Sequence, residues 1–115
     1  MRTRPTLYIF VLCLASIGCS QPSGPARHVP VSMKKYAISP AEIRLREGET
    51  VRFEVFTEDV QHGFDVPALG IREPVNPGKP AVFTYTATRK GRFQVDCGIL
   101  CGPRHDDMKA VLIVE

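Results

Sequence analysis

The sequence predicts an all-β fold, arranged as a sandwich of two sheets. Apolar and polar residues alternate with a period of two in several segments, which is typical of strands that bury one face. Turn-forming residues separate these segments at intervals of about 8–12 residues, a spacing found in β-sandwiches and barrels. No segment has the apolar pattern of an amphipathic helix of three turns. Together these observations favour a small all-β domain.

The expected strands begin near residue 31 and continue to the end of the chain. Val51, Phe53 and Val55 alternate with charged residues, and the segments around Phe83 and Phe93 alternate in the same way. The last segment is a continuous apolar run, which suits a strand buried on both faces. Gly and Pro residues mark the turns between the segments. In order, the expected strands cover residues 33–38, 43–45, 51–55, 81–85, 93–95 and 110–114.

The length and net charge of the chain limit the functions that it can have. The 115 residues suffice for one domain, and the formal net charge is +3. Arg2 and Arg4 lie in a segment that we expect to be removed, which leaves 13 Lys and Arg against 12 Asp and Glu, a net charge of +1. A nucleic-acid-binding domain usually carries a clustered basic face. We therefore expect no nucleic-acid partner.

The amino-terminal residues have the pattern of an export signal. Two arginines precede an apolar run over residues 7–18, and a cysteine, Cys19, follows directly. The run is shorter than the ~20 residues of a membrane-spanning helix. The segment resembles a bacterial lipoprotein signal, which implies a signal peptide over 1–18 and a lipid on Cys19. Ser16 departs from the leucine usual there, and an ordinary signal cleaved near Cys19 is the alternative.

Residues 19–30 are expected to form the lipid-attachment site and a flexible tether, because Pro, Ser and Gly dominate without apolar periodicity. His28 lies in this tether, where we expect an exposed histidine. The folded domain is expected over 31–115. It then contains only two cysteines, Cys97 and Cys101, because Cys13 leaves with the signal.

A cluster of metal-binding residue types follows the strand expected at 93–95. Its pattern is Cys97-x3-Cys101-x3-His105-x2-Met108, and His62 can add a second imidazole. Thiolate, thioether and imidazole donors suit copper. A disulfide between the cysteines is an alternative in an exported protein. Zinc is another, although structural zinc sites seldom use a thioether.

Two segments carry a resemblance to a known family. DVQHGFDVPALG at 59–70 and the cluster at 97–108 resemble the binuclear copper-A domain of cytochrome oxidase subunit II, a cupredoxin fold, over roughly residues 36–114. The resemblance implies a Greek-key sandwich with the metal loop between the last two strands. It implies two copper ions and six ligands: Cys97 and Cys101 as bridges, His62 and Met108 on one ion, and His105 with the Ile99 backbone carbonyl on the other.

The chain departs from this family at three points. Many members carry Glu at the position of Ile99, where the side chain helps a metal site at the junction with the catalytic subunit, and isoleucine cannot take that role. The chain has no Trp, whereas many oxidase subunits receive electrons through an aromatic cluster. Family members normally have a membrane helix, and this chain has only the short signal.

The function expected from these features is extracytoplasmic electron transfer by a lipid-anchored protein with a copper-A centre. It would relay single electrons from a cytochrome-type donor to a respiratory acceptor without catalysing bond chemistry. Three alternatives stay open: a subunit II-like component of a haem-copper oxidase, a copper carrier or assembly protein, and a disulfide-stabilised module without metal. Several acidic residues lie near the cluster, and we interpret them as solvated surface charge in preference to a docking patch for a basic partner: Asp59, Asp65, Asp96, Asp106 and Asp107.

Overall fold

The computed structural model describes Thr3 and residues 26–115. The expected signal peptide, apart from Thr3, and Cys19 lie outside the described residues. None of the helices in the described part is long and apolar enough to cross a membrane. The elements are β1 (Arg27–Lys34), β2 (Ala37–Ser39), β3 (Glu42–Leu45), β4 (Thr50–Thr57), β5 (His62–Val66), the 3-10 helix η1 (Pro67–Leu69), β6 (Ile71–Val75), β7 (Ala81–Thr86), β8 (Gly91–Cys97), the 3-10 helix η2 (His105–Asp107) and β9 (Lys109–Val114).

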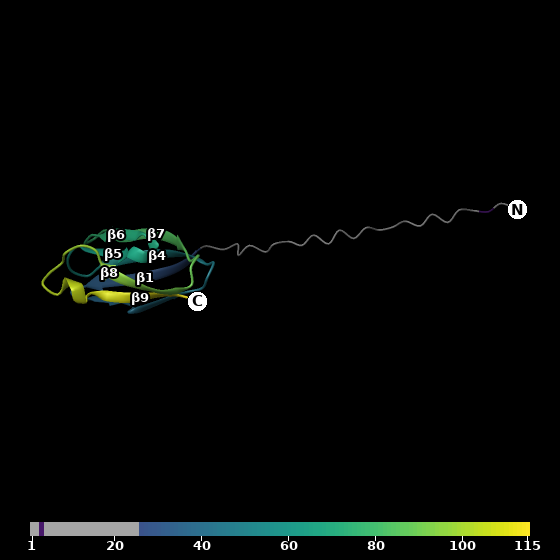
Figure 1. Ribbon diagram of the computed structural model, residues 1–115. Helices are drawn as coiled ribbons and strands as arrows, with labels where there is room; N and C mark the ends of the chain where they lie inside the picture. The colour runs from purple at the N-terminus through teal and green to yellow at the C-terminus, as the bar shows by residue number, and fades with distance from the viewer. Residues whose placement is uncertain (1–2, 4–25) are drawn as a thin grey trace.

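The strands form two sheets packed face to face (Figure 1). One sheet has the order β2-β1-β4-β7, and the other has the order β3-β9-β8-β5-β6. The pairs β1–β4 and β3–β9 are parallel, and the other pairs are antiparallel. The loop between β8 and β9, which carries the cysteine cluster, lies at the end of the sandwich opposite the C-terminus (Figure 1). The predicted all-β sandwich with its metal loop between the last two strands is confirmed.

The prediction of a single strand over residues 33–38 is wrong. The chain reverses at Lys35 and Tyr36, and β1 and β2 form an antiparallel hairpin in which Met33 faces Ile38. Successive side chains of a strand point to opposite faces, so residues five apart in one strand could not both face the core. The reversal allows both Met33 and Ile38 to be buried.

The first strand begins earlier than the sequence indicated. β1 starts at Arg27 and pairs with β4 from Arg27↔Val51 onward, so residues 27–30 belong to the sandwich and not to a flexible tether. Val29 is buried, as are Val31 and Met33, which extends the period-two pattern across Pro30. His28 is exposed as expected, but it lies in this strand.

Two strands had no counterpart in the sequence prediction. β5 is buried at four of its five positions, so its residues do not alternate between apolar and polar. β6 contains Pro74, which weakens a strand prediction, and it lies at the edge of its sheet, where a proline is tolerated. The other expected strands coincide with β3, β4, β7, β8 and β9.

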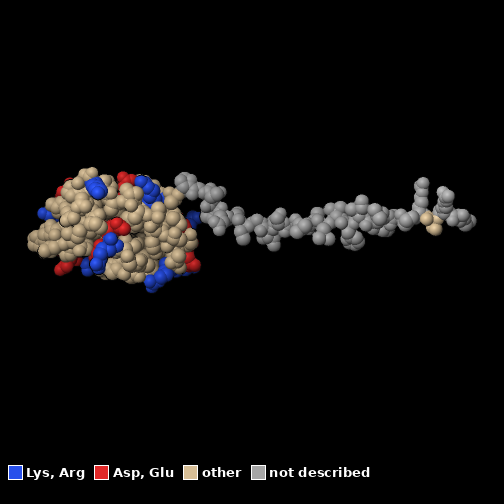
Figure 2. Space-filling model, turned by 90° about the horizontal axis from the view of Figure 1, so that it is seen from above, with Lys and Arg blue, Asp and Glu red and all other residues tan. Residues whose placement is uncertain are grey.

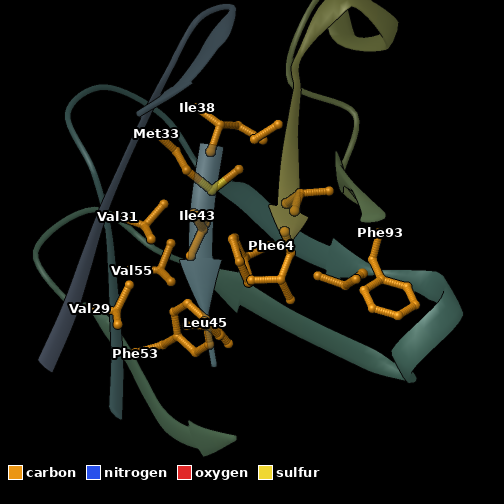
Figure 3. Packing of buried hydrophobic residues seen from close by; sticks show 14 of the residues in the cluster. Val29, Val31, Met33, Ile38, Ile43, Leu45, Phe53, Val55, Phe64 and Phe93 are labelled. Carbon is orange, nitrogen blue, oxygen red and sulfur yellow. The ribbon is translucent and has the colours of Figure 1, made fainter. Parts of the chain in front are cut away.

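Valine, leucine, isoleucine and phenylalanine side chains from both sheets fill the interior (Figure 3). Phe53 of β4 and Phe64 of β5 are fully buried, and their ring centroids lie 5.6 Å apart. Burial of one such side chain contributes about 2–3 kcal/mol. Because Phe64 pairs with Cys97 in the neighbouring strand, this core also fixes where β8 ends.

Candidate metal centre

The predicted ligands come from two neighbouring strands and one loop. His62 is the first residue of β5, and Cys97 is the last residue of β8. These strands are adjacent, with Phe64 opposite Cys97, so His62 lies next to Cys97 at the same end of the sheet. The loop after β8 brings Cys101, His105 and Met108 to this end.

Every predicted ligand lies beside one of the two thiols. Cys97 Sγ is 3.7 Å from His62 Nδ1 and 3.1 Å from the carbonyl oxygen of Ile99. Cys101 Sγ is 3.7 Å from His105 Nδ1 and 3.8 Å from Met108 Sδ. The two sulfur atoms are 3.9 Å apart. The structure therefore brings together all six groups that the sequence singled out, with the thiol pair at the centre.

The two sides of this cluster differ in exposure. His62, Cys97 and Met108 are buried, whereas Cys101 and His105 are partly exposed. A hollow of about 320 Å³ reaches the cluster from solvent, lined in part by His105, Cys97 and Met108. One side of the centre thus packs against the core, and the other meets the surface.

The two cysteines are free thiols. Their 3.9 Å separation is almost twice the ~2.05 Å of a disulfide bond. Burial, together with the hydrogen bond and charge of Cys97, raises the pKa of the Cys101 thiol to about 11. Metals bind cysteine as the thiolate, so binding at this site must release protons.

Asp59 orients the buried imidazole of His62. Its Oδ1 lies 2.7 Å from His62 Nε2, which leaves Nδ1 directed at Cys97. Oδ2 of Asp59 accepts a 2.7 Å hydrogen bond from the backbone N–H of Lys35, and Oδ1 accepts one of 2.6 Å from Val60. Partial burial raises the pKa of Asp59, but these hydrogen bonds and the one from His62 outweigh it and hold the pKa well below its usual range.

Sequence reasoning missed this role of Asp59, which we grouped with solvated surface charge. The signal available in the sequence is the spacing Asp59-x-x-His62, which brings a carboxylate next to an imidazole across a tight turn. Metal-binding histidines commonly donate their second ring N–H to such a carboxylate, which fixes the tautomer.

Glycines allow the ligand loop to approach β5 closely. The backbone N–H of Gly98 donates a 3.1 Å hydrogen bond to the carbonyl of Gly63. A Cβ on Gly63 would lie 3.1 Å from Gly98 N, and a Cβ on Gly98 would overlap the carboxylate of Asp65. This contact holds the Ile99 carbonyl beside Cys97.

The comparisons with known proteins identify the family. The family model of the cytochrome c oxidase subunit II periplasmic domain matches residues 29–114. The chain belongs to this family. Cytochrome c oxidase subunit 2 of Thermus thermophilus is 30% identical over 80 residues, which cover 70% of this chain and 59% of that protein. A second subunit 2 from the same species matches with the same identity over 48% of its length, so the chain spans about half the length of the curated relatives it matches.

Solved structures of similar fold support the same architecture. The periplasmic domain of cytochrome oxidase subunit II from Bradyrhizobium japonicum aligns with a TM-score of 0.70 at 21% identity, over 77% of this chain and 83% of that one. The metal-binding domain of the Cu(I)-exporting P-type ATPase of Streptococcus pneumoniae D39, solved with Cu(I), gives 0.59 at 20% identity, over 76% and 84%. These likenesses confirm the predicted cupredoxin-like sandwich.

Proposed function

We propose that this chain is an extracytoplasmic electron-transfer protein that holds two copper ions in a copper-A centre and relays single electrons. The observation that carries the proposal is the arrangement around the thiol pair. Cys97 has one imidazole and one carbonyl beside it, and Cys101 has one imidazole and one thioether. Two bridging thiolates with separate terminal ligands suit two metal ions better than one.

The donor set fits copper. Thiolate and thioether are soft donors, and imidazole binds copper in either common oxidation state. Met108 is 1% exposed, and its sulfur lies 3.8 Å from Cys101 Sγ. In the proposed assignment Cys97 and Cys101 would be shared by both ions, His62 and Met108 would complete one, and His105 with the Ile99 carbonyl would complete the other. The copper pair, when bound, would accept and release one electron at a time.

The chain's own groups keep the ligand geometry fixed. The strands β5 and β8 hold His62 and Cys97, and Asp59 holds the His62 ring. Backbone hydrogen bonds between residues three apart in the sequence stabilise the loop. They run from His105 N–H to Gly102 O and from Met108 N–H to His105 O. A fixed geometry suits electron transfer, because little rearrangement then accompanies each electron.

Copper loading of the full chain tests the proposal. We expect two copper ions per chain, and an electron spin resonance spectrum of a mixed-valence pair shared by two equivalent ions. A matched Arg44→Ala variant, changed at the opposite end, should give the same spectrum. One copper per chain with a single-ion spectrum would instead favour a copper carrier, and a chain that takes up no copper would refute both.

A subunit of a haem-copper oxidase is the second candidate, and the family membership favours it. In that role the chain would pass electrons to a catalytic subunit. Co-purification with a haem-containing subunit from its native membrane would support it, and isolation as a lone chain with an intact centre would support the independent carrier of electrons. The hydrocarbon side chain of Ile99 could not bind a further metal ion at such a junction.

The surface supports a protein partner rather than a nucleic acid. Lys and Arg are interspersed with Asp and Glu over the face shown in Figure 2, and the end at the left is mostly uncharged in this view. Leu100, in the ligand loop, is 81% exposed. We propose that a redox partner such as a cytochrome c or an oxidase catalytic subunit docks at this end.

The acidic residues of this end support only weak electrostatic steering. Asp59 is engaged with His62, Asp65 lies 3.7 Å from Arg72, and Asp107 lies 2.9 Å from Arg104. Because the charges of Asp65 and Asp107 are partly neutralised by these arginines, we expect electron-transfer rates to depend weakly on ionic strength. A steep fall with added salt would refute this and favour a basic partner.

We further propose that Cys19 is lipidated and anchors the domain to a membrane. The support is the apolar run followed by a cysteine in the sequence. Mass spectrometry of the full chain isolated from membranes should show a lipid on Cys19 as the first residue. A protein that begins elsewhere, or carries a free Cys19, would refute the anchor without affecting the copper proposal.

A further inference from the structure

Two residues in the turn between β1 and β2, Lys35 and Tyr36, contact both segments that carry the predicted ligands. This turn belongs to the sheet that contributes no ligand. Its Lys35 N–H donates to Asp59, which in turn holds His62. Its Tyr36 ring lies against the ligand loop between Cys101 and His105.

The contact with the loop is close at Gly102. A Cβ built there would lie 2.5 Å from the hydroxyl oxygen of Tyr36 and 3.2 Å from its ring carbons. Gly102 also has φ of +153°, which side chains rarely adopt. The loop can therefore approach the Tyr36 side chain this closely only because residue 102 is glycine.

Arg104 extends the contact over the rest of the loop. Its guanidinium carbon lies 5.6 Å from the centre of the Tyr36 ring, a cation–π distance. Its Nε lies 2.9 Å from Asp107 Oδ2. The Tyr36 ring, the Arg104 guanidinium and the Asp107 carboxylate thus form a chain of contacts along the segment from Gly102 to Asp107, which contains His105.

We propose that Tyr36 is a positioning residue for the copper centre. The turn at 35–36 braces the ligand loop and the Asp59–His62 pair against each other, so it sets the separation of the two imidazoles across the thiol pair. The effect on copper rests on the proposed function. The effect on the loop does not, because it exists in the metal-free protein.

The first test therefore uses metal-free full chain. The rate of Cys101 alkylation by iodoacetamide is measured by peptide mass spectrometry, which separates it from the other cysteines. Tyr36→Ala should increase this rate roughly tenfold, equivalent to about 1.4 kcal/mol in loop opening. Tyr36→Phe keeps the ring and should stay within about twofold of the wild type.

Tyr85→Ala is the matched control, because Tyr85 is partly buried as Tyr36 is, but it packs against the core and pairs with Val51 at the opposite end. It should destabilise the fold without a selective change at Cys101. The proposal is overturned if Tyr36→Ala accelerates Cys101 alkylation no more than Tyr85→Ala does.

The second test uses the copper-loaded chain. Tyr36→Ala should shift the reduction potential and the copper hyperfine splitting, whereas Tyr36→Phe and Tyr85→Ala should leave both at wild-type values. Unchanged spectra and potential in a Tyr36→Ala chain that holds two copper ions would overturn the positioning role. A wild-type chain that takes up no copper would refute the proposed function, and the alkylation test would still decide whether Tyr36 holds the loop.

Discussion

The two ends of this sandwich are held together by different kinds of contact. At the end that carries the ligands, His62 and Cys97 are buried, Cys101 is partly buried, and backbone N–H groups hold Asp59 and the loop. At the other end, ion pairs join exposed or partly exposed side chains: Arg27–Glu49, Arg44–Glu42, Arg44–Glu115 and Lys90–Glu47.

Because of this difference, we expect the two ends to respond differently to substitution. An exposed ion pair contributes about 0–1 kcal/mol, so its loss should leave the fold intact. A buried polar group that loses its partner costs more, and here the partners also hold the ligands. We expect substitutions at the ligand end to alter the metal centre more than the stability, and substitutions at the ion-pair end to do the reverse.

The largest expected effect follows the replacement of a bridging thiol. Cys97→Ser should abolish the two-copper centre, because one remaining thiolate cannot bridge both ions. Copper content measured on the purified full chain should fall below two per chain, with loss of the mixed-valence resonance. A Cys97→Ser protein that retains both would show that Cys97 is not a bridge.

The second-largest effect on the metal centre is expected from loss of the Asp59 carboxylate. Asp59→Ala leaves the His62 Nε2 without its partner and frees the ring to rotate, so copper affinity should fall roughly 10–100-fold, as for other carboxylate partners of metal-bound histidines. Competitive titration with a copper chelator measures this. Asp106→Ala, a change to an exposed aspartate at the same end, is the control, and an equal loss of affinity in both variants would contradict the orienting role.

Met108→Leu should be milder. The thioether is the weakest of the proposed ligands, so copper should remain bound while the reduction potential changes. The swap conserves volume and should cost less than about 1.5 kcal/mol of stability. Potentiometry distinguishes it from Met33→Leu, which changes a buried methionine of β1 and should keep the wild-type potential. Equal potentials in all three proteins would remove Met108 from the ligand set.

Glu49→Gln, at the ion-pair end, should have the smallest effect. Hydrogen bonds from Arg27 and from the backbone of Arg46 lower the pKa of Glu49 below its ordinary 4.5. The stabilisation of the fold by the ionised Glu49 carboxylate is therefore complete above about pH 4.5. It disappears as the pH falls through the lower pKa that Glu49 has in the folded state. Denaturant unfolding should show that Glu49→Gln lowers the free energy of unfolding by about 1 kcal/mol at neutral pH. This difference from the wild type should decrease toward zero in acid. The copper content should not change, and a change there would break the distinction between the two ends.

Sequence reasoning predicted the sandwich, and it picked out ligand candidates that lie together in the structure, because both depend on local signals. Period-two alternation reveals strands such as β4, and the spacing from Cys97 to Met108 is short enough to read directly. The reversal at Lys35 and Tyr36 was missed, because apolar residues on both sides of the turn look like one strand until their faces are compared. β5 was missed because a strand buried on both faces shows no alternation.

The supporting contacts of the site depend on which segments become neighbours in space. Asp59 is of a residue type common at the surface, and the hydrogen bond to its Oδ2 comes from the distant turn that carries Lys35. Tyr36 and Gly102 are more than sixty residues apart in the sequence, and their contact depends on both sheets. No local pattern in either segment reports such a contact.

The direction of β1 determines which end of the domain an attachment upstream of Arg27 would join. The strand enters the fold at the ion-pair end and spans eight residues, about 25 Å at ~3.3 Å per residue, before it reaches the turn against the ligand loop. Any attachment upstream of Arg27 would therefore join the domain at its ion-pair end. The ligand loop, with the exposed Leu100, lies at the opposite end of the domain from that attachment point, so the attachment would not cover it.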